Sequence, residues 1–221
     1  PDGEELIYSS ERPYFDLYRR ASDASSPPGP LVTGGFDHYG GGVSADGRLF
    51  AYTLSTPNGS QLWTVPLQGR QPPLRYLSNG FNLAHPVLSP DGRWMAYDSD
   101  ESGRIEVYVQ SYPDPIRKRW KVSPSYGSEP QWTRGGRELV YRSGDSVLAV
   151  SMDLENGRSG TPAVLFAGPY PDNPGYTRPR SYDVSRDGER FLMMKLPTGL
   201  PEPRVMVVVN WFDELLAKVP R

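Results

Sequence analysis

The chain repeats one short phrase five times, and this repetition constrains its fold more than any other feature. The phrase is a tight turn of the Pro-Asp-Gly-Arg type, followed by an apolar and aromatic run. Its glycines stand at positions 3, 47, 92, 136 and 188, so successive copies are 44, 45, 44 and 52 residues apart. A period of about 40–50 residues is typical of repeat architectures in which each copy forms one supersecondary unit.

The third copy shows what one unit contains. Residues 85–89 lead into Pro90-Asp91-Gly92-Arg93, a turn in which proline fixes φ and glycine takes a positive φ. Asp-Gly between apolar runs is a strong hairpin signal. Three further runs complete four predicted strands, at 94–99, 105–110 and 119–123. Four antiparallel strands in about 44 residues correspond to one blade of a β-propeller.

The sequence therefore predicts an all-β chain, a propeller of four-stranded antiparallel blades. The blades are expected at about 1–35, 36–80, 81–127, 128–168 and 178–210. Apolar residues at 212, 215, 216 and 219 predict a short C-terminal helix over 211–219. The first blade lacks an innermost strand, and the last has runs at 181–184, 191–195 and 204–209 before the helix. We expect the five repeats to be part of a ring of about six to eight blades, with the others upstream; a closed five-bladed ring would need the missing strands from elsewhere.

Composition excludes several classes of function. Lys and Arg number 24 and Asp and Glu number 26, so the net charge of −2 gives no bulk attraction to nucleic acid, and no nucleic-acid partner is expected. The longest aliphatic run, 205–209, is far shorter than the roughly 20 residues of a membrane helix, so no membrane insertion is expected. The chain has no cysteine, which excludes disulfides and thiol catalysis.

The phrases at 88–97 (LSPDGRWMAY) and 98–109 (DSDESGRIEVYV) resemble the WD40-like Tol-type propeller repeat, also called PD40. The Gly-His and Trp-Asp signatures of true WD40 blades are missing. The second, fourth and fifth turns replace proline by Ala45, Arg134 and Arg186, and the fourth also has Gly135 in place of aspartate, so their turn types stay open.

The segment 204–215 (RVMVVVNWFDEL) looks like the C-terminus of large bacterial multidomain proteins. In those proteins such a propeller follows a serine/threonine kinase or a winged-helix regulator domain, so the resemblance implies a binding module with an upstream domain on the same polypeptide. The best-known relative of the repeat is the periplasmic propeller of the Tol system, which binds protein partners. This implies a periplasmic or extracytoplasmic location. Similar propellers precede α/β-hydrolase domains in prolyl-oligopeptidase-like peptidases.

No catalytic or metal-binding constellation stands out. The nucleophile elbow, the zinc-protease motif and the phosphate-binding loop motif are all missing, so we predict that the chain is not an enzyme. Residues 98–103 resemble the first half of a calcium loop, but Val109 occupies the position of its bidentate glutamate, which favours a plain acidic turn. His38 and His85 could ligate a metal if carboxylates joined them, but a channel-lining or hydrogen-bonded role is favoured. No metal and no cofactor are predicted, and the turn residues Asp46, Asp91 and Asp187 are expected to cap their turns.

The longest spacing, 52 residues, reflects an insertion at 168–182 that is rich in Pro, Tyr and Arg. Tyr and Arg are enriched at interface hot spots. Together with loops of other blades, the insertion is predicted to form a binding rim at the channel mouth, composed of His38, Tyr39, Phe81, Asn82, His85, Tyr126, Glu129, Tyr170, Tyr176, Arg178 and Arg180. The alternative is an ordered surface loop whose tyrosines pack on a blade.

The predicted function is non-catalytic binding of a protein or peptide. Two alternatives stay open. One is a substrate-gating propeller of a prolyl-oligopeptidase-like enzyme, and the other is a small-ligand sensor linked to a kinase or a transcription regulator.

Overall fold

The computed structural model describes residues 3–11, 13–69, 71–170 and 180–194. The predicted helix at 211–219, the run at 204–209, Tyr176 and Arg178 lie outside these residues. The described part of the chain is all-β, as predicted, and its one helical element is the 3₁₀ turn η1(Arg134–Gly136). No described helix has the length and apolar character needed to cross a bilayer.

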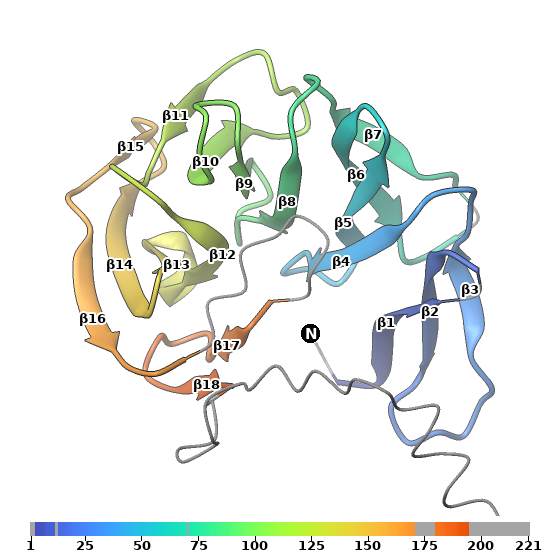
Figure 1. Ribbon diagram of the computed structural model, residues 1–221. Coiled ribbons are helices and arrows are strands. Elements are labelled where there is room, and N and C mark those ends of the chain that lie inside the picture. The colour runs from blue at the N-terminus through green and yellow to red at the C-terminus, as the bar shows by residue number, and fades with distance from the viewer. Residues whose placement is uncertain (1–2, 12, 70, 171–179, 195–221) are drawn as a thin grey trace, which may run out of the picture.

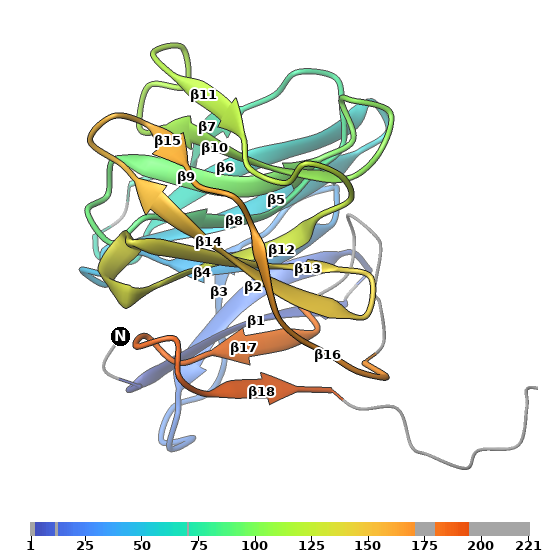
Figure 2. The same cartoon turned by 90° about the vertical axis from the view of Figure 1, so that its left-hand side faces the viewer.

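The strands form antiparallel sheets that lie around a common centre like the blades of a propeller (Figures 1 and 2). Blade 1 contains β1(Glu5–Glu11), β2(Phe15–Ala21) and β3(Gly29–Val32); blade 2 contains β4(His38–Val43), β5(Leu49–Thr56), β6(Gly59–Pro66) and β7(Leu74–Leu77); blade 3 contains β8(Leu83–Leu88), β9(Trp94–Ser99), β10(Glu106–Ser111) and β11(Arg119–Lys121). Blade 4 contains β12(Ser128–Thr133), β13(Glu138–Ser143) and β14(Ser146–Asp153), with β15(Arg158–Ser159) and β16(Ala163–Ala167) both paired to β14; blade 5 contains β17(Tyr182–Val184) and β18(Phe191–Met193). The first strands of blades 2 to 5 lie innermost (Figure 1).

The repeated turn joins the innermost strand of a blade to the next strand. In blade 3, Ser89 Oγ donates to Asp91 Oδ1 at 2.5 Å and accepts the Trp94 amide at 3.0 Å. The Gly92 amide donates to the Ser89 carbonyl at 2.9 Å, and Gly92 has φ of +69°. Blades 2 and 5 repeat this arrangement with Asp46 and Asp187. The prediction that these aspartates cap their turns is confirmed.

The fourth copy of the turn differs, because its sequence lacks the capping aspartate. Residues Arg134–Gly136 form the 3₁₀ turn η1, and all three have a positive φ, of 51°, 68° and 89°. The two glycines adopt this backbone without strain, since they carry no Cβ.

The core lies between neighbouring blades. Four apolar clusters join blade 1 to 2, 2 to 3, 3 to 4 and 4 to 5. The tyrosine at the equivalent position after the second, third and fourth turns is a buried side chain, since Tyr52, Tyr97 and Tyr141 are at most 2% exposed. The position of the turn in the repeat therefore also fixes which side chains meet between blades.

The two end blades expose residues that the inner blades bury. Leu6 in blade 1 is 51% exposed, whereas its equivalent in blade 2, Phe50, is 5% exposed. Leu192 in blade 5 is 76% exposed, whereas its equivalent in blade 3, Ala96, is 0% exposed. The described strands thus form an arc with an uncovered apolar face at each end. That further blades complete a ring stays a prediction.

Candidate functional site

The innermost strands share an irregularity at one position of the repeat. Alignment on the turns places Gly40, His85, Glu129 and Ser181 at equivalent positions. The ladders of β4, β8 and β12 shift register at this position in blades 2, 3 and 4. His85 and Glu129 have a positive φ of 50° and 57°, which is strained for residues with a side chain. Such bulges turn backbone groups out of the sheet, and here carbonyl oxygens are available at the centre.

Arg180, which stands just before β17, donates hydrogen bonds to carbonyls at this centre. Its guanidinium donates to the carbonyl of Gly41 at 2.7 Å and to that of His85 at 3.2 Å. Burial lowers the pKa of the Arg180 guanidinium, although nearby acidic groups oppose this. Among the described residues no carboxylate forms an ion pair with Arg180, and its buried Nε has no hydrogen-bond partner. One cation thus ties blade 5 to blades 2 and 3.

The glycine beside this contact is required by close packing. A Cβ on Gly41 would lie 2.4 Å from the Ala51 carbonyl oxygen and 2.5 Å from the Pro86 carbonyl oxygen. The run of glycines at 40–42, which in the sequence indicates only backbone freedom, therefore allows the centre to close around Arg180.

Glu129 joins blade 4 to blade 5. Its side chain is 1% exposed, and Oε2 accepts the Ser181 amide at 2.6 Å and the Ser181 hydroxyl at 2.8 Å. The Tyr182 hydroxyl donates to the Glu129 carbonyl at 2.8 Å and lies 3.2 Å from the Val140 carbonyl. Burial raises the pKa of Tyr182. The hydroxyl is therefore a neutral donor in this contact.

His85 forms a buried pair with Asp98, a residue of β9. The imidazole Nδ1 is 3.0 Å from both carboxylate oxygens, and the side chains are 4% and 2% exposed. Burial alone lowers the pKa of His85, but the charge and the hydrogen bond of Asp98 raise it by more, so the pKa is raised overall. Asp98 also accepts the Glu129 amide at 3.4 Å, which links blade 3 to blade 4.

His38 has a different position in the repeat and a different partner. Its Nδ1 lies 3.2 Å from the Phe15 carbonyl and 3.4 Å from Asp16 Oδ1, so it joins blade 2 to blade 1. Burial lowers the pKa of His38 by more than these two groups raise it. Within the described residues no group of three or more His, Asp or Glu side chains could hold a metal ion.

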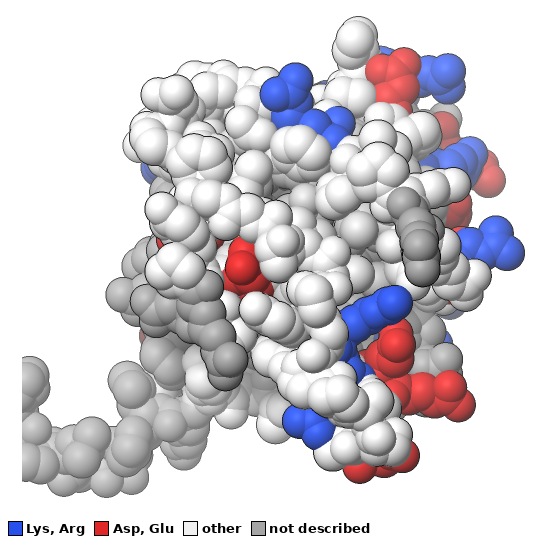
Figure 3. All heavy atoms as spheres, turned by 90° about the vertical axis from the view of Figure 1, so that its right-hand side faces the viewer, with Lys and Arg blue, Asp and Glu red and all other residues white. Residues whose placement is uncertain are grey.

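Two cavities are lined by inner-strand residues and both reach Arg180. The channel cavity has a volume of about 420 Å³ and is lined by Gly42, Val43, Ser44, Ala45, Val87, Leu88, Pro90, Gln131, Trp132, Gly135, Arg180 and Arg186. The edge cavity has a volume of about 520 Å³ and is lined by Ile7, Tyr8, Ser9, Phe15, Tyr39, Gly40, Gly41, Phe50 and Arg180. The second is mostly apolar and aromatic. Figure 3 shows the side of the molecule that carries blades 1 and 2, where charged side chains gather along one margin and most of the surface is uncharged.

The structure brings together some of the predicted rim residues and separates others. His85, Glu129 and Arg180 meet at the centre, and Tyr39 lines the edge cavity with Arg180. Tyr39 also contacts the Phe15 ring, with a centroid distance of 5.6 Å.

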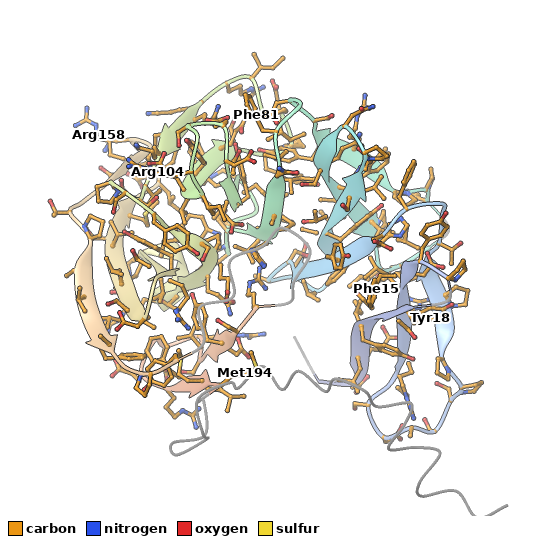
Figure 4. All side chains as sticks on the ribbon, in the orientation of Figure 1. Phe15, Tyr18, Phe81, Arg104, Arg158 and Met194 are labelled. Carbon is orange, nitrogen blue, oxygen red and sulfur yellow. The ribbon has the colours of Figure 1, made fainter. Side chains whose placement is uncertain are left out.

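Three further rim residues contact residues of the same blade or the adjoining strand. Asn82 bonds the Asp100 carboxylate through its amide and side chain, Tyr126 OH lies 3.5 Å from Ser128 Oγ, and Tyr170 packs edge-on against Phe166. Phe81 is 45% exposed in the loop before β8, away from Phe15 of blade 1 (Figure 4). That these residues form one rim stays a prediction.

The hydrogen bonds at the centre of the propeller form one network, here called the central network, which consists of Gly41, His85, Asp98, Glu129, Arg180 and Ser181. Sequence reasoning missed Asp98, Ser181 and Gly41 as members of this network. The signal was available, because the repeat register aligns Ser181 with His85 and Glu129. The repeat register is obvious only at the turns, where the phrase is well preserved. At the bulge the inner strands share no residue type, so nothing in the sequence marks that position.

Comparison with known proteins supports the fold. No family model matches the chain, and no curated protein sequence matches it. TolB from Agrobacterium tumefaciens is 20% identical, with a TM-score of 0.62 over 75% of this chain and 62% of that protein. An oligogalacturonate lyase in complex with manganese is 16% identical, with a TM-score of 0.60 over 89% and 57%. Oligopeptidase B from Trypanosoma brucei with covalently bound antipain is 14% identical, with a TM-score of 0.54 over 77% and 27%.

The chain spans less than two thirds of each of these three proteins. At such identities the likeness shows the fold alone, which is a β-propeller. The resemblance to the Tol-type repeat that the turn phrases indicate is confirmed at this level.

Proposed function

We propose that the chain is a non-catalytic binding module that takes up a segment of a protein or peptide at the centre of the propeller. The observation that carries this proposal is the pair of cavities, about 420 Å³ and 520 Å³, that both reach Arg180. Binding sites are concave and mostly apolar, with a few placed polar groups, and the edge cavity has this composition.

The groups that could do acid–base chemistry support binding rather than catalysis. His85 and Asp98 bond each other, and Glu129 bonds Ser181, each across a contact that fixes the position of an inner strand. These hydrogen bonds give His85, Asp98 and Glu129 a structural role, which is to hold the inner strands in position.

Peptide selection tests the proposal directly. The 221-residue chain is immobilised and panned with displayed random peptides, and the selected peptides are measured by isothermal titration calorimetry. We expect saturable binding with an unchanged peptide mass after incubation. Two variants form a matched pair. Ala45→Trp, which narrows the channel cavity, is expected to weaken peptide binding, whereas Ala163→Trp, on the exposed outer strand of blade 4, is expected to leave it unchanged. Failure to select any peptide that binds saturably would refute the proposal, and cleavage of the peptides would replace it by an enzymatic function.

The alternatives have distinct tests. A substrate-gating propeller requires a hydrolase domain on the same polypeptide, so intact mass and N-terminal sequencing of the protein from its own cell address it. A small-ligand sensor would be stabilised by its ligand in a thermal-shift screen, because a ligand that binds only the folded state raises the melting temperature.

A further inference from the structure

The outermost strand of a blade has one edge that points away from the centre of the propeller (Figure 1). In blades 1 to 4 these strands are β3, β7, β11 and β16, and their outward edges pair with no described strand. Such an edge is a template for pairing with another chain, and proteins protect it with charged side chains or proline. The further blades of a complete ring would lie beside the end blades and leave this circumference open.

Three of the four outer strands carry the expected protection. β3 contains Pro30, β7 contains Arg75, and β11 contains Arg119 and Lys121. β16 has the sequence Ala-Val-Leu-Phe-Ala, without a charged residue or a proline. Among the outer strands that the structure describes, β16 is therefore the one without this protection.

Large apolar side chains are exposed along β16. Val164 is 60% exposed and Leu165 is 45% exposed, and no other two consecutive large apolar residues are both exposed in the described part of the chain. Phe166, by contrast, packs edge-on against Phe191 of blade 5, with a centroid distance of 5.1 Å. The strand is thus held in place while its neighbouring apolar side chains stay uncovered.

The lack of charge around β16 indicates what kind of partner fits this edge. Residues 159–170 contain no Asp, Glu, Lys or Arg, although these make up 23% of the whole chain. Interfaces between unlike proteins are arranged so that opposite charges meet. A segment that meets its own copy must instead avoid like charges, because like charges directly opposite destabilise a strand pair. The uncharged segment therefore favours a second copy of this chain.

The sequence of β16 also suits antiparallel pairing with itself. With a two-fold axis at Leu165, Ala163 faces Ala167 of the second copy, Val164 faces Phe166, and Leu165 faces its own equivalent. Every pair joins two apolar side chains. The register of β16 against β14 shifts close to Leu165, so few hydrogen bonds can continue across the axis and side chains supply most of the contact.

We propose that β16 is a self-association edge, at which two copies of this chain join antiparallel across a two-fold axis near Leu165. A two-fold contact uses the same patch on both copies, so it closes after two. Five residues on each side bury much less than the roughly 1,600 Å² of a typical stable complex, so the dimer dissociates on dilution. The inference is independent of the binding function proposed above, because β16 lies on the circumference and the two cavities lie at the inner strands.

Sedimentation equilibrium of the 221-residue chain over a series of concentrations tests the proposal. We expect the mass of one copy at low concentration and of two copies at high concentration. Leu165→Lys places two ammonium groups against each other, so the dissociation constant of the dimer should rise about tenfold or more. Leu74→Lys is the matched control, because Leu74 is 63% exposed on the outer strand β7, and it should leave the constant unchanged.

A single cysteine reports the position of the axis, since the chain has no cysteine of its own. In Leu165→Cys the two thiols face each other across the axis. The oxidant diamide takes up the hydrogens of both thiols and leaves a disulfide between the two copies. We expect a covalent dimer of Leu165→Cys and little or none of Leu74→Cys under the same conditions.

The outcomes decide the proposal in either direction. A chain that sediments as one copy at every concentration would refute it. A dimer that persists in Leu165→Lys, and that Leu165→Cys does not cross-link, forms through another surface and also refutes it. If Leu165→Lys does not fold, Val164→Lys replaces it, because Val164 is more exposed. Peptide selection tests the binding function separately, so either idea can fail while the other stands.

Discussion

Glu129 gives the sharpest test of the central network, because its buried carboxylate carries the contact between blades 4 and 5. Its Oε2 accepts two hydrogen bonds from Ser181, at 2.6 Å and 2.8 Å, and the side chain is 1% exposed. In Glu129→Ala both bonds are lost, and the Ser181 amide stays buried without an acceptor. A hydrogen bond to a charged group contributes about 1.5–3 kcal/mol, so two independent bonds would contribute about 3–6 kcal/mol. Because these two bonds share one oxygen, we expect the free energy of unfolding to fall by about 3–4 kcal/mol, near the lower end of that range.

Glu129→Gln separates charge from shape. The glutamine oxygen can still accept both donors, so only the charge assistance is lost, and a decrease of about 1–2 kcal/mol is expected. All three side chains have a Cβ and must adopt the same φ of 57°, so the cost of the backbone conformation is nearly the same in each.

Urea unfolding at pH 7 measures these changes, provided that the slope of the free energy against urea is unchanged. Glu189→Ala is the matched control, because Glu189 forms an exposed ion pair with Arg134 whose loss should cost about 1 kcal/mol or less. The reasoning is refuted if Glu129→Ala costs no more than this control, or if Gln and Ala at position 129 are equally destabilising.

Three further perturbations follow from the structure. Gly41→Ala places a Cβ within 2.5 Å of two backbone carbonyls and should lower stability by about 3 kcal/mol or more, whereas Gly35→Ala, with nothing within 4 Å, should change it by less than about 0.5 kcal/mol; urea unfolding of the pair shows equal effects if the close packing is wrong. The Ser44 hydrogen bond lowers the pKa of Asp46, so its contribution is present above the unfolded pKa and is lost as pH falls through the folded value; Asp46→Asn should lower the melting temperature by a few degrees at pH 7, and this difference should shrink as the pH falls through the folded pKa of Asp46. The pKa of His85 is raised and that of His38 is lowered, so the melting temperature of the unaltered chain relative to His85→Asn should be higher at pH 5.5 than at pH 8, and relative to His38→Asn it should be lower at pH 5.5; slopes of the same sign would contradict both assignments.

The strand pattern was predictable from the sequence because its determinants are local. Asp91 and Gly92 form a turn from their own backbone preferences, and the alternation of apolar and polar residues at 105–110 predicts a strand. The structure has this strand as β10, but both of its faces are buried, because neighbouring blades cover both sides. The outer strand predicted at 119–123 corresponds to β11 for the same reason. Departures occur where the phrase changes, as at Gly135, where the turn becomes η1.

The centre of the propeller was predictable only in part. His85, Glu129 and Arg180 could be singled out by residue type, but their partners lie 13, 52 and 139 residues away in the sequence. Contacts at such separation depend on how many blades intervene and how each bulge turns the chain. Likewise, Arg180 has as its main partners backbone carbonyls of Gly41 and His85, and a backbone carbonyl has no signature in the sequence.

The sequence by itself determined the period, the turns and the antiparallel blades, since each of these follows from backbone preferences and side-chain alternation within about 45 residues. Only the tertiary structure decided which polar groups meet at the centre. It also decided that Leu6 and Leu192, apolar residues at positions that inner blades bury, lie exposed at the two ends of the arc. The physical reason is that burial at a blade face is set by the neighbouring blade, and no property of the strand itself specifies that neighbour.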